Sequence, residues 1–233
     1  MNKIPSFFFA LLLTLTLSAQ EDEYINDHLR LGFKTGVNST SMIYYNKSPE
    51  AGLSSTPKIG FLIGGSLYVP LSKNFIPFIE LNFENLSSKI AYKKAYSPKA
   101  VSEFFTGDIS LNYISLSICP NLVFDIHHIK LNFYSGFHLS FPLFTNEKGI
   151  YKKVIIDEQS GNQINVSTEV NGPNKYLTDG IDSGFLSGFG LEYKLTQKTA
   201  LHFDSRFRFG TVLIGNSFKS RSWGFSAGIV YDL

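Results

Sequence analysis

Apolar side chains occupy every second position in segment after segment of this chain. Near its start, Leu29, Leu31, Phe33 and Val37 alternate with polar residues and glycines. Such a period of two is typical of a β-strand with one apolar face, because successive side chains of a strand point to opposite sides. The same alternation recurs over residues 59–69, 79–83, 131–141, 185–193, 201–209 and 223–233. The pattern predicts half-buried strands and nowhere sustains the spacing of a helix.

One further segment, residues 109–124, alternates less regularly. Ile109 and Leu111 occupy odd positions, whereas Ile114, Leu116 and Ile118 occupy even ones. A one-residue β-bulge near residues 112–114 would bring both sets onto one face. With this segment the chain has eight predicted strands.

The connections between the predicted strands alternate between long and short. The long ones cover residues 39–56, 87–106 and 143–182, and the short ones cover residues 71–74, 125–128 and 196–198. Outer-membrane barrels have an even number of strands, short periplasmic turns and long outer loops, and a strand of about 9–11 residues crosses the bilayer. We therefore expect an all-β fold, an eight-stranded antiparallel up-and-down transmembrane β-barrel.

A soluble ligand-binding barrel, such as a lipocalin, would show the same period of two. The volumes of the two faces distinguish these alternatives. Phe, Leu, Ile, Tyr and Trp dominate one face, whereas Gly and Ser are frequent on the other. Because the interior of an eight-stranded barrel is just wide enough to be filled by side chains, the bulky apolar face is expected outside, against lipid.

The N-terminus has the features of a secretory signal. A basic start at Lys3 precedes an apolar run from Phe7 to Leu17 and small residues at Ser18 and Ala19. We expect a signal peptide over residues 1–20, with cleavage after Ala19 or one residue later, and a barrel domain over residues 21–233. The alternative for the apolar run is a membrane anchor. The predicted location is the bacterial outer membrane.

Composition excludes several classes of function. The formal charge is +2 with acids and bases interspersed, which offers no basic patch for nucleic acid. After residue 20 no stretch has the roughly 18–20 consecutive apolar residues of a membrane-spanning helix. Cys119 is the single cysteine, so no intramolecular disulfide can form.

Several strings resemble the PorT-like outer-membrane β-barrel family of Bacteroidetes. They span most of the chain after the signal segment and lie at residues 31–38 (LGFKTGVN), 60–72, 111–120, 184–193 and 224–231. The chain departs from the family pattern in the residues before Pro120 and in ending on Leu233 rather than Phe. The family is named after a member needed for type IX protein secretion, so the resemblance implies an outer-membrane barrel and a possible role as a secretion-accessory component.

Charged residues gather on the face predicted to line the lumen. An isolated ion buried there would be very unfavourable, so charges of both signs must pair. We expect a plug of salt bridges and hydrogen bonds centred on Arg206 and Arg208, with Lys194 and His202 on the same face. The predicted lumen polar network comprises Lys34, Glu80, Glu84, Lys130, His138, Glu192, Asp204, Arg206 and Arg208.

The sequence offers little for catalysis, metals or cofactors. His138 and Ser140 share a face, with Glu147 beyond, which is similar to the residue types of lipid A acylhydrolases. That face is the predicted lumen, whereas an enzyme acting on lipid needs its nucleophile toward the bilayer. His127, His128 and Asp125 form too sparse a set for a metal site. We therefore expect no enzyme activity, no cofactor and no bound metal.

The long loops are where a partner would bind. Within residues 143–182, the runs 151–156 and 163–170 alternate around Ser160, Gly161 and Asn162, and either form a hairpin above the membrane or stay unstructured. The expected function is a non-enzymatic structural or binding role through these loops, with outer-membrane lipid around the wall and a protein partner at residues 143–182. The alternative is a narrow transporter or channel for small solutes.

Overall fold

The computed structural model describes residues 28–44, 53–96, 101–156, 162–173, 181–211 and 218–233. The expected signal peptide, residues 1–20, lies outside these ranges. The strands are β1 (Arg30–Tyr44), β2 (Leu53–Tyr68), β3 (Phe78–Tyr96), β4 (Val101–Cys119), β5 (Asn121–Ile126), β6 (Ile129–Ile156), β7 (Gln163–Pro173), β8 (Asp182–Lys194), β9 (Thr199–Gly210) and β10 (Phe218–Asp232). No helix in the described ranges is long and apolar enough to cross a membrane.

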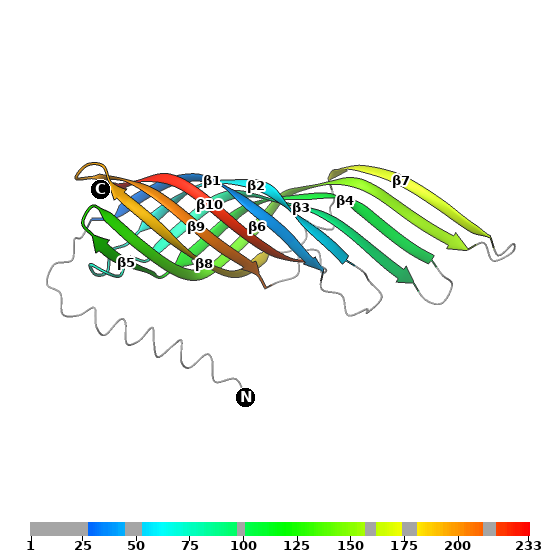
Figure 1. Ribbon diagram of the computed structural model, residues 1–233, viewed down its shortest axis with the longest axis horizontal. Helices are drawn as coiled ribbons and strands as arrows, with labels where there is room; N and C mark the ends of the chain where they lie inside the picture. Colours follow the sequence, from blue (N-terminus) through cyan, green and yellow to red (C-terminus); the bar gives the residue numbers. More distant parts are fainter. Residues whose placement is uncertain (1–27, 45–52, 97–100, 157–161, 174–180, 212–217) are drawn as a thin grey trace, which may run out of the picture.

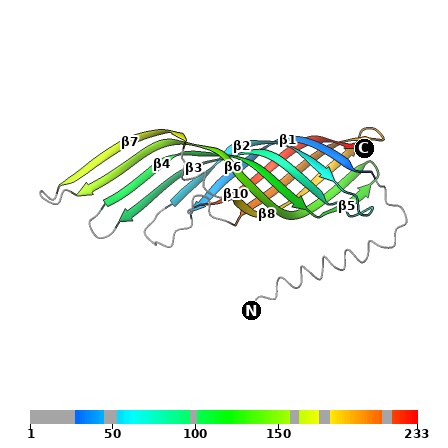
Figure 2. The ribbon, with the colours of Figure 1, turned by 180° about the vertical axis from the view of Figure 1, so that it is seen from behind.

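The strands close into a ring. β1 pairs with β2 and β10, and the order continues through β3 and β4 to β6, β8 and β9, with every pair antiparallel. β5 continues the path of β4 beyond Pro120 and pairs with the start of β6, so the two form one strand of the wall. The ring therefore has eight strands, as the sequence predicted (Figures 1 and 2).

The strands are strongly inclined to the barrel axis. The register can be followed once round the ring from Leu31 through Leu67, Ile79, Ile118, Phe137, Phe185, Phe209 and Arg221 to Ser41. The path returns to β1 ten residues beyond its start, from 31 to 41. A shear of this size in an eight-stranded barrel corresponds to a tilt of about 35–45°.

The two faces of the wall differ as expected for a barrel in lipid. Outward side chains are apolar and accessible, with Phe33 61% exposed and Phe137 65% exposed. Their neighbours Lys34 and His138 point inward and are 4% and 2% exposed. Pleating alone produces this contrast, because adjacent residues of a strand face opposite sides. The bulky parity faces the bilayer.

The predicted bulge in the fourth strand is wrong in its position. The register between β4 and β6 does shift beside Asn112, but the additional residue is Leu143 on β6. Inward and outward side chains alternate along β4 without an extra residue, so Ile109 and Leu111 are buried inside the barrel rather than facing lipid. The odd-numbered apolar residues of this strand face the lumen and the even-numbered ones face outward, because the lumen is apolar at the level of Ile109 and Leu111.

Part of the wall continues beyond the ring as a sheet extension, defined here as residues 93–96 of β3, 101–106 of β4, 145–156 of β6 and 163–173 of β7 (Figure 1). The predicted connection over residues 87–106 is thus largely strand, with β3 and β4 paired up to Tyr96 and Val101. Of the two alternatives left open for residues 151–170, the structure has the hairpin, since Tyr151 pairs with Thr168 and Ile156 with Gln163.

The connections divide the barrel into two distinct ends. Short links join β2 to β3, β5 to β6 and β8 to β9, over residues 69–77, 127–128 and 195–198. His127 has a φ of 57°, a left-handed conformation that suits a two-residue hairpin turn. We call this the short-turn end, and the opposite one, which carries the sheet extension, the long-loop end. In outer-membrane barrels the short turns lie in the periplasm.

Candidate functional site

A ladder of alternating charges runs along the lumen, built mainly from inward-facing residues of β1, β3, β8 and β9. These positions are polar in the sequence because each follows the pleat to the inside, where eight strands leave room only for side chains. At the short-turn end, Arg30 Nε donates to Asp232 Oδ1 at 2.7 Å, and Arg30 Nη2 donates to Glu192 Oε2 at 2.6 Å. The Glu192 carboxylate in turn lies 3.6 Å from His202 Nδ1.

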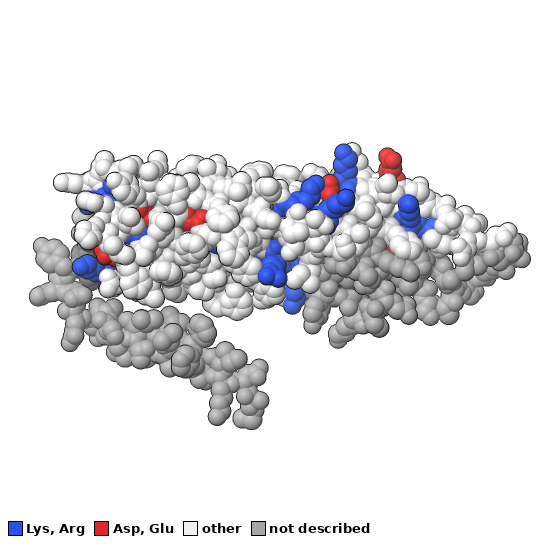
Figure 3. All heavy atoms as spheres, viewed as in Figure 1, with Lys and Arg blue, Asp and Glu red and all other residues white. Residues whose placement is uncertain are grey.

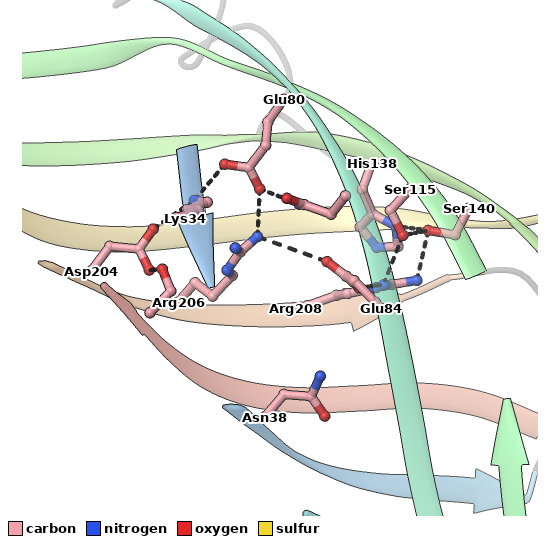
Figure 4. Close-up of polar contacts among 12 residues, drawn as sticks. Lys34, Asn38, Glu80, Glu84, Ser115, His138, Ser140, Asp204, Arg206 and Arg208 are labelled. Atoms are coloured by element: carbon pink, nitrogen blue, oxygen red, sulfur yellow. Dashed lines mark hydrogen bonds and ion pairs between the residues drawn. The ribbon is translucent and has the colours of Figure 1, made fainter. Parts of the chain in front are cut away.

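The middle of the ladder surrounds Lys34. Its Nζ lies 2.5 Å from Glu80 Oε2 and 2.8 Å from Asp204 Oδ2, and His202 Nε2 lies 3.7 Å from the same Asp204 oxygen. Arg206 Nη1 donates to Glu80 Oε1 at 2.7 Å. Figure 4 shows Glu80 between Lys34 and Arg206. Each charge in this group therefore contacts a charge of opposite sign.

The upper part of the ladder is organised by Arg208. Its Nη1 donates to Glu84, and its Nη2 donates to Asp182 Oδ2 at 2.9 Å and to Ser140 Oγ at 2.8 Å. Ser140 Oγ lies 2.8 Å from Ser115 Oγ on the opposing strand (Figure 4). The guanidinium thus connects β9 to β3, β8, β4 and β6 across the lumen.

Neutral groups add hydrogen bonds to three of the carboxylates. The Tyr134 hydroxyl donates to Asp204 Oδ2 at 3.1 Å, and the Ser226 hydroxyl donates to Asp204 Oδ1 at 2.6 Å. Asn132 Nδ2 donates to Glu192 Oε1 at 3.3 Å, and Asn82 Nδ2 donates to Glu80. Buried ions need such hydrogen bonds, because pairing alone rarely offsets the loss of hydration. Arg206 Nε and Nη2 and Arg208 Nε have no hydrogen-bond partner among the described residues.

Two apolar clusters flank the ladder. Toward the long-loop end lie Met42, Leu86, Ile90, Phe105, Ile109, Leu111 and Tyr113. Toward the short-turn end lie Tyr68, Ile76, Phe78, Cys119, Val123, Tyr134, Leu186 and Val230. Beside the second cluster, the space bounded by Lys34, Phe78 and Asn121 is too narrow to admit the centre of a water molecule. In the described ranges, side chains of the wall itself fill the lumen.

Eight of the nine residues predicted for the lumen network are buried inside the barrel: Lys34, Glu80, Glu84, His138, Glu192, Asp204, Arg206 and Arg208. The ninth, Lys130, does not lie in the ladder. Its side chain is 37% exposed at the short-turn end and pairs with Asp125 at 4.0 Å, because β6 begins at Ile129 and Lys130 lies at the rim. Lys194, of the same parity, is also exposed.

Sequence reasoning missed three members of the ladder, Arg30, Asp182 and Asp232. Arg30 belongs to the polar parity of the first strand, so its alternation with Leu29 and Leu31 was a usable signal. The alternation places Asp182 at the boundary of a predicted loop, whereas it begins β8 and is 1% exposed. Its pairing with Arg208 depends on the tilt of β9 across the lumen, which the sequence does not display.

The residues considered for catalysis are not assembled as a site on the lipid face. His138 Nδ1 lies 3.5 Å from Ser140 Oγ, but both side chains are buried in the lumen. Glu147 accepts a hydrogen bond from the Tyr151 hydroxyl at 2.9 Å in the sheet extension. Across the described ranges no group of three or more His, Cys, Asp or Glu residues has the arrangement of a metal site.

Comparison with known proteins identifies the class. The chain matches the family model of an outer membrane protein beta-barrel domain over residues 18–219. It is similar to Neisserial surface protein A (15% identity, TM-score 0.43, covering 87% of this chain and 97% of that one). It is also similar to the attachment invasion locus protein Ail of Yersinia pestis in complex with the heparin analogue sucrose octasulfate (11% identity, TM-score 0.39, covering 87% and 99%) and to OprG of Pseudomonas aeruginosa (10% identity, TM-score 0.42, covering 88% and 95%).

No curated protein matches the chain. The closed ring, the apolar outer wall and the polar interior define an integral outer-membrane β-barrel of a bacterial cell. With a family match over most of its length, the chain belongs to the outer membrane protein beta-barrel domain family.

Proposed function

We propose that this protein is a non-enzymatic, closed barrel that holds a protein-binding sheet outside the membrane. The observation that carries the proposal is the sheet extension. β7 pairs with β6 over residues 163–173 and with no other described strand. Its side chains are almost all exposed, including Ile164 (49%) and Val166 (44%).

An open strand edge of this kind offers unpaired backbone groups to another chain. A partner that presents an extended segment can add to such an edge, with main-chain hydrogen bonds supplying affinity and alternate side chains supplying selectivity. β7 carries one acidic side chain, Glu169, and no Lys or Arg. The usual protections against strand addition are therefore sparse along it.

The partner class we infer is a protein with an extended segment. The resemblance to the PorT-like barrels of Bacteroidetes extends the proposal to a component that assists protein secretion. The buried ladder supports the same interpretation in a different way, because a filled lumen leaves the outer sheet as the part available for a specific task.

Shortening the hairpin tests this function. Gly149 and Val170 are paired, so residues 150–169 can be replaced by Asn-Gly, which closes a two-residue hairpin turn. The shortened protein is expected to reach the outer membrane and to fold, as judged by heat-dependent mobility on a gel. Type IX secretion of a reporter protein by a host that lacks its own copy of this gene should then be lost.

A photo-reactive amino acid at Val166 provides the second measurement. It is expected to cross-link one protein partner in cells. The same probe at exposed Lys198, on the short-turn end, serves as the control. Equal cross-linking at both positions, or normal secretion by the shortened hairpin, would show that the extension is not a docking site.

A further inference from the structure

Basic side chains cluster on the outer surface at the upper rim of the apolar wall. On β10 the outward row runs through Ile229, Phe225 and Trp223 and then reaches Arg221. Figure 3 shows a largely white barrel wall on this face, with blue side chains gathered where the wall meets the sheet extension. We call Lys58, Lys89, Lys148 and Arg221 the basic collar; all four are exposed.

Arg221 and Lys89 each lie just beyond the end of an outward apolar row, toward the long-loop end. Trp223, half exposed two residues after Arg221 on the same face, is of the type enriched at membrane–water interfaces. On β3 the outward apolar residues Ile79, Leu81 and Phe83 are followed by Asn85, Ser87 and then Lys89. In both rows the basic residue lies one step beyond the interfacial residues, where the charged lipid headgroups begin.

A layer of neutral polar groups separates the apolar wall from the collar on β3 and β4. Asn85 Nδ2 donates to Ser110 Oγ and to Asn112 Oδ1, both at 2.8 Å, and the Ser87 hydroxyl donates to Asn85 Oδ1 at 2.8 Å. The outer face of this wall thus changes from apolar to neutral polar to charged toward the long-loop end, with Lys89 on β3 beside Asp108 on β4. That sequence matches the acyl, ester and phosphate layers of one lipid leaflet.

The cations of the collar outnumber its acids. Asp108 is the single carboxylate in its row, and it lies between Lys89 on β3 and Lys148 on β6 in the register. Its Oδ2 accepts a hydrogen bond from Lys58 Nζ at 2.7 Å. Three lysines therefore surround one aspartate, and Arg221 adds a further charge, stacked 5.4 Å over the Phe207 ring. The excess positive charge is available to an anion.

We propose that the basic collar binds the phosphate groups of anionic lipids in the outer leaflet. The lipid source follows from position, because the acyl chains of a lipid whose phosphate sits at the collar would lie against the apolar wall below it. Lysine and arginine recognise phosphate by charge and by hydrogen-bond donation. Such a contact fixes the depth of the barrel and sets how far the sheet extension stands above the membrane.

The single tryptophan makes this site measurable, because Trp223 lies beside Arg221 on the lipid-facing wall. The purified protein is folded into vesicles of equal parts phosphatidylcholine and phosphatidylglycerol, with the acyl chains of one lipid or the other dibrominated. Bromine quenches a nearby tryptophan, so the ratio of quenching reports which lipid occupies the collar. The wild type is expected to favour phosphatidylglycerol by about fivefold, the size expected for one cation at a charged surface.

The variant Lys58→Gln/Lys89→Gln/Arg221→Gln should reduce this preference to about equal occupancy, whereas Lys73→Gln/Lys194→Gln/Lys198→Gln, which removes three exposed lysines at the short-turn end, should keep it. Heat-dependent gel mobility confirms that each variant is folded.

Equal quenching by both lipids in the wild type would overturn the proposal. So would loss of the preference when inorganic phosphate replaces chloride at constant ionic strength, since the collar would then be a site for free anions.

Discussion

At the scale of single residues, the lumen is stabilised by charges that each have more than one partner. Glu80 contacts both Lys34 and Arg206, and Arg208 contacts both Glu84 and Asp182. A charge left without its partner in such an environment is strongly destabilising, although the intact pair need not exceed a well-packed apolar pair in stability. We therefore expect the ladder to favour one specific packing of the lumen. Removing only part of it should strongly lower the free energy of unfolding.

Removing one side of the Glu80 to Arg206 contact tests this penalty. Arg206→Gln is expected to lower the free energy of unfolding by about 3–5 kcal/mol, because Glu80 loses its guanidinium partner while remaining 1% exposed. Glu80→Gln should have an effect of similar size. The double variant should be more stable than the sum of the two changes predicts. Urea titration of the barrel in lipid vesicles, followed by Trp223 fluorescence, provides the free energies.

The matched control is a pair at the surface. Lys58 and Asp108 are joined at 2.7 Å, but their side chains are 44% and 42% exposed. Asp108→Asn should therefore change stability by less than about 1 kcal/mol. Additive effects of Glu80→Gln and Arg206→Gln would mean that the two side chains do not interact in the folded barrel.

At the scale of elements, alternation in the sequence was sufficient to predict eight strands and the faces of most of them. It could not locate the irregularities. The apolar residues Ile109 and Leu111 suggested a bulge in β4, whereas the extra residue is Leu143 on β6, because an apolar cluster in the upper lumen uses the inner face of β4. Where both faces of a strand contact apolar surroundings, apolar residues occur at odd and even positions alike, and alternation no longer shows which face points inward.

Strand contact also explains why glycines occur on the inner face. A Cβ at Gly64 would lie 2.4 Å from the Leu81 carbonyl oxygen and 2.0 Å from Asn82 Oδ1, whereas one at the adjacent Gly65 would find only the Gly32 carbonyl oxygen, at 3.5 Å. Gly64→Ala is expected to destabilise the barrel by about 1–3 kcal/mol through overpacking. Gly65→Ala should stay within about 0.5 kcal/mol of the wild type.

The two variants are compared by the midpoint of urea unfolding in the same vesicles. They differ by one position in one strand, so propensity and composition are matched and only the direction of the added methyl group changes. An equal shift of both midpoints would mean that the inner face of β2 is not packed against β3 as closely as the register requires.

At the scale of the whole molecule, the sequence predicted closure of the ring and a polar interior, because both follow from strand number and parity. It did not reveal the shear of ten residues, which decides which charges face one another across the lumen. Arg208 meets Asp182 and Glu84 only because tilted strands bring β8, β9 and β3 to one level. Nor did it separate the ladder from the apolar clusters at either end.

A lumen filled by the wall itself should not conduct, and this separates the proposed binding barrel from a narrow transporter. Purified protein in a planar bilayer is expected to show no steady unitary conductance. The variant with residues 150–169 replaced by Asn-Gly should be equally silent, because the ladder and its flanking clusters, not the hairpin, fill the barrel. A steady conductance in the wild type would require a continuous water path past Arg206 and Arg208 and would favour transport. A conductance that arises only after the hairpin is shortened would identify the extension as a gate, and the lumen as open beneath it.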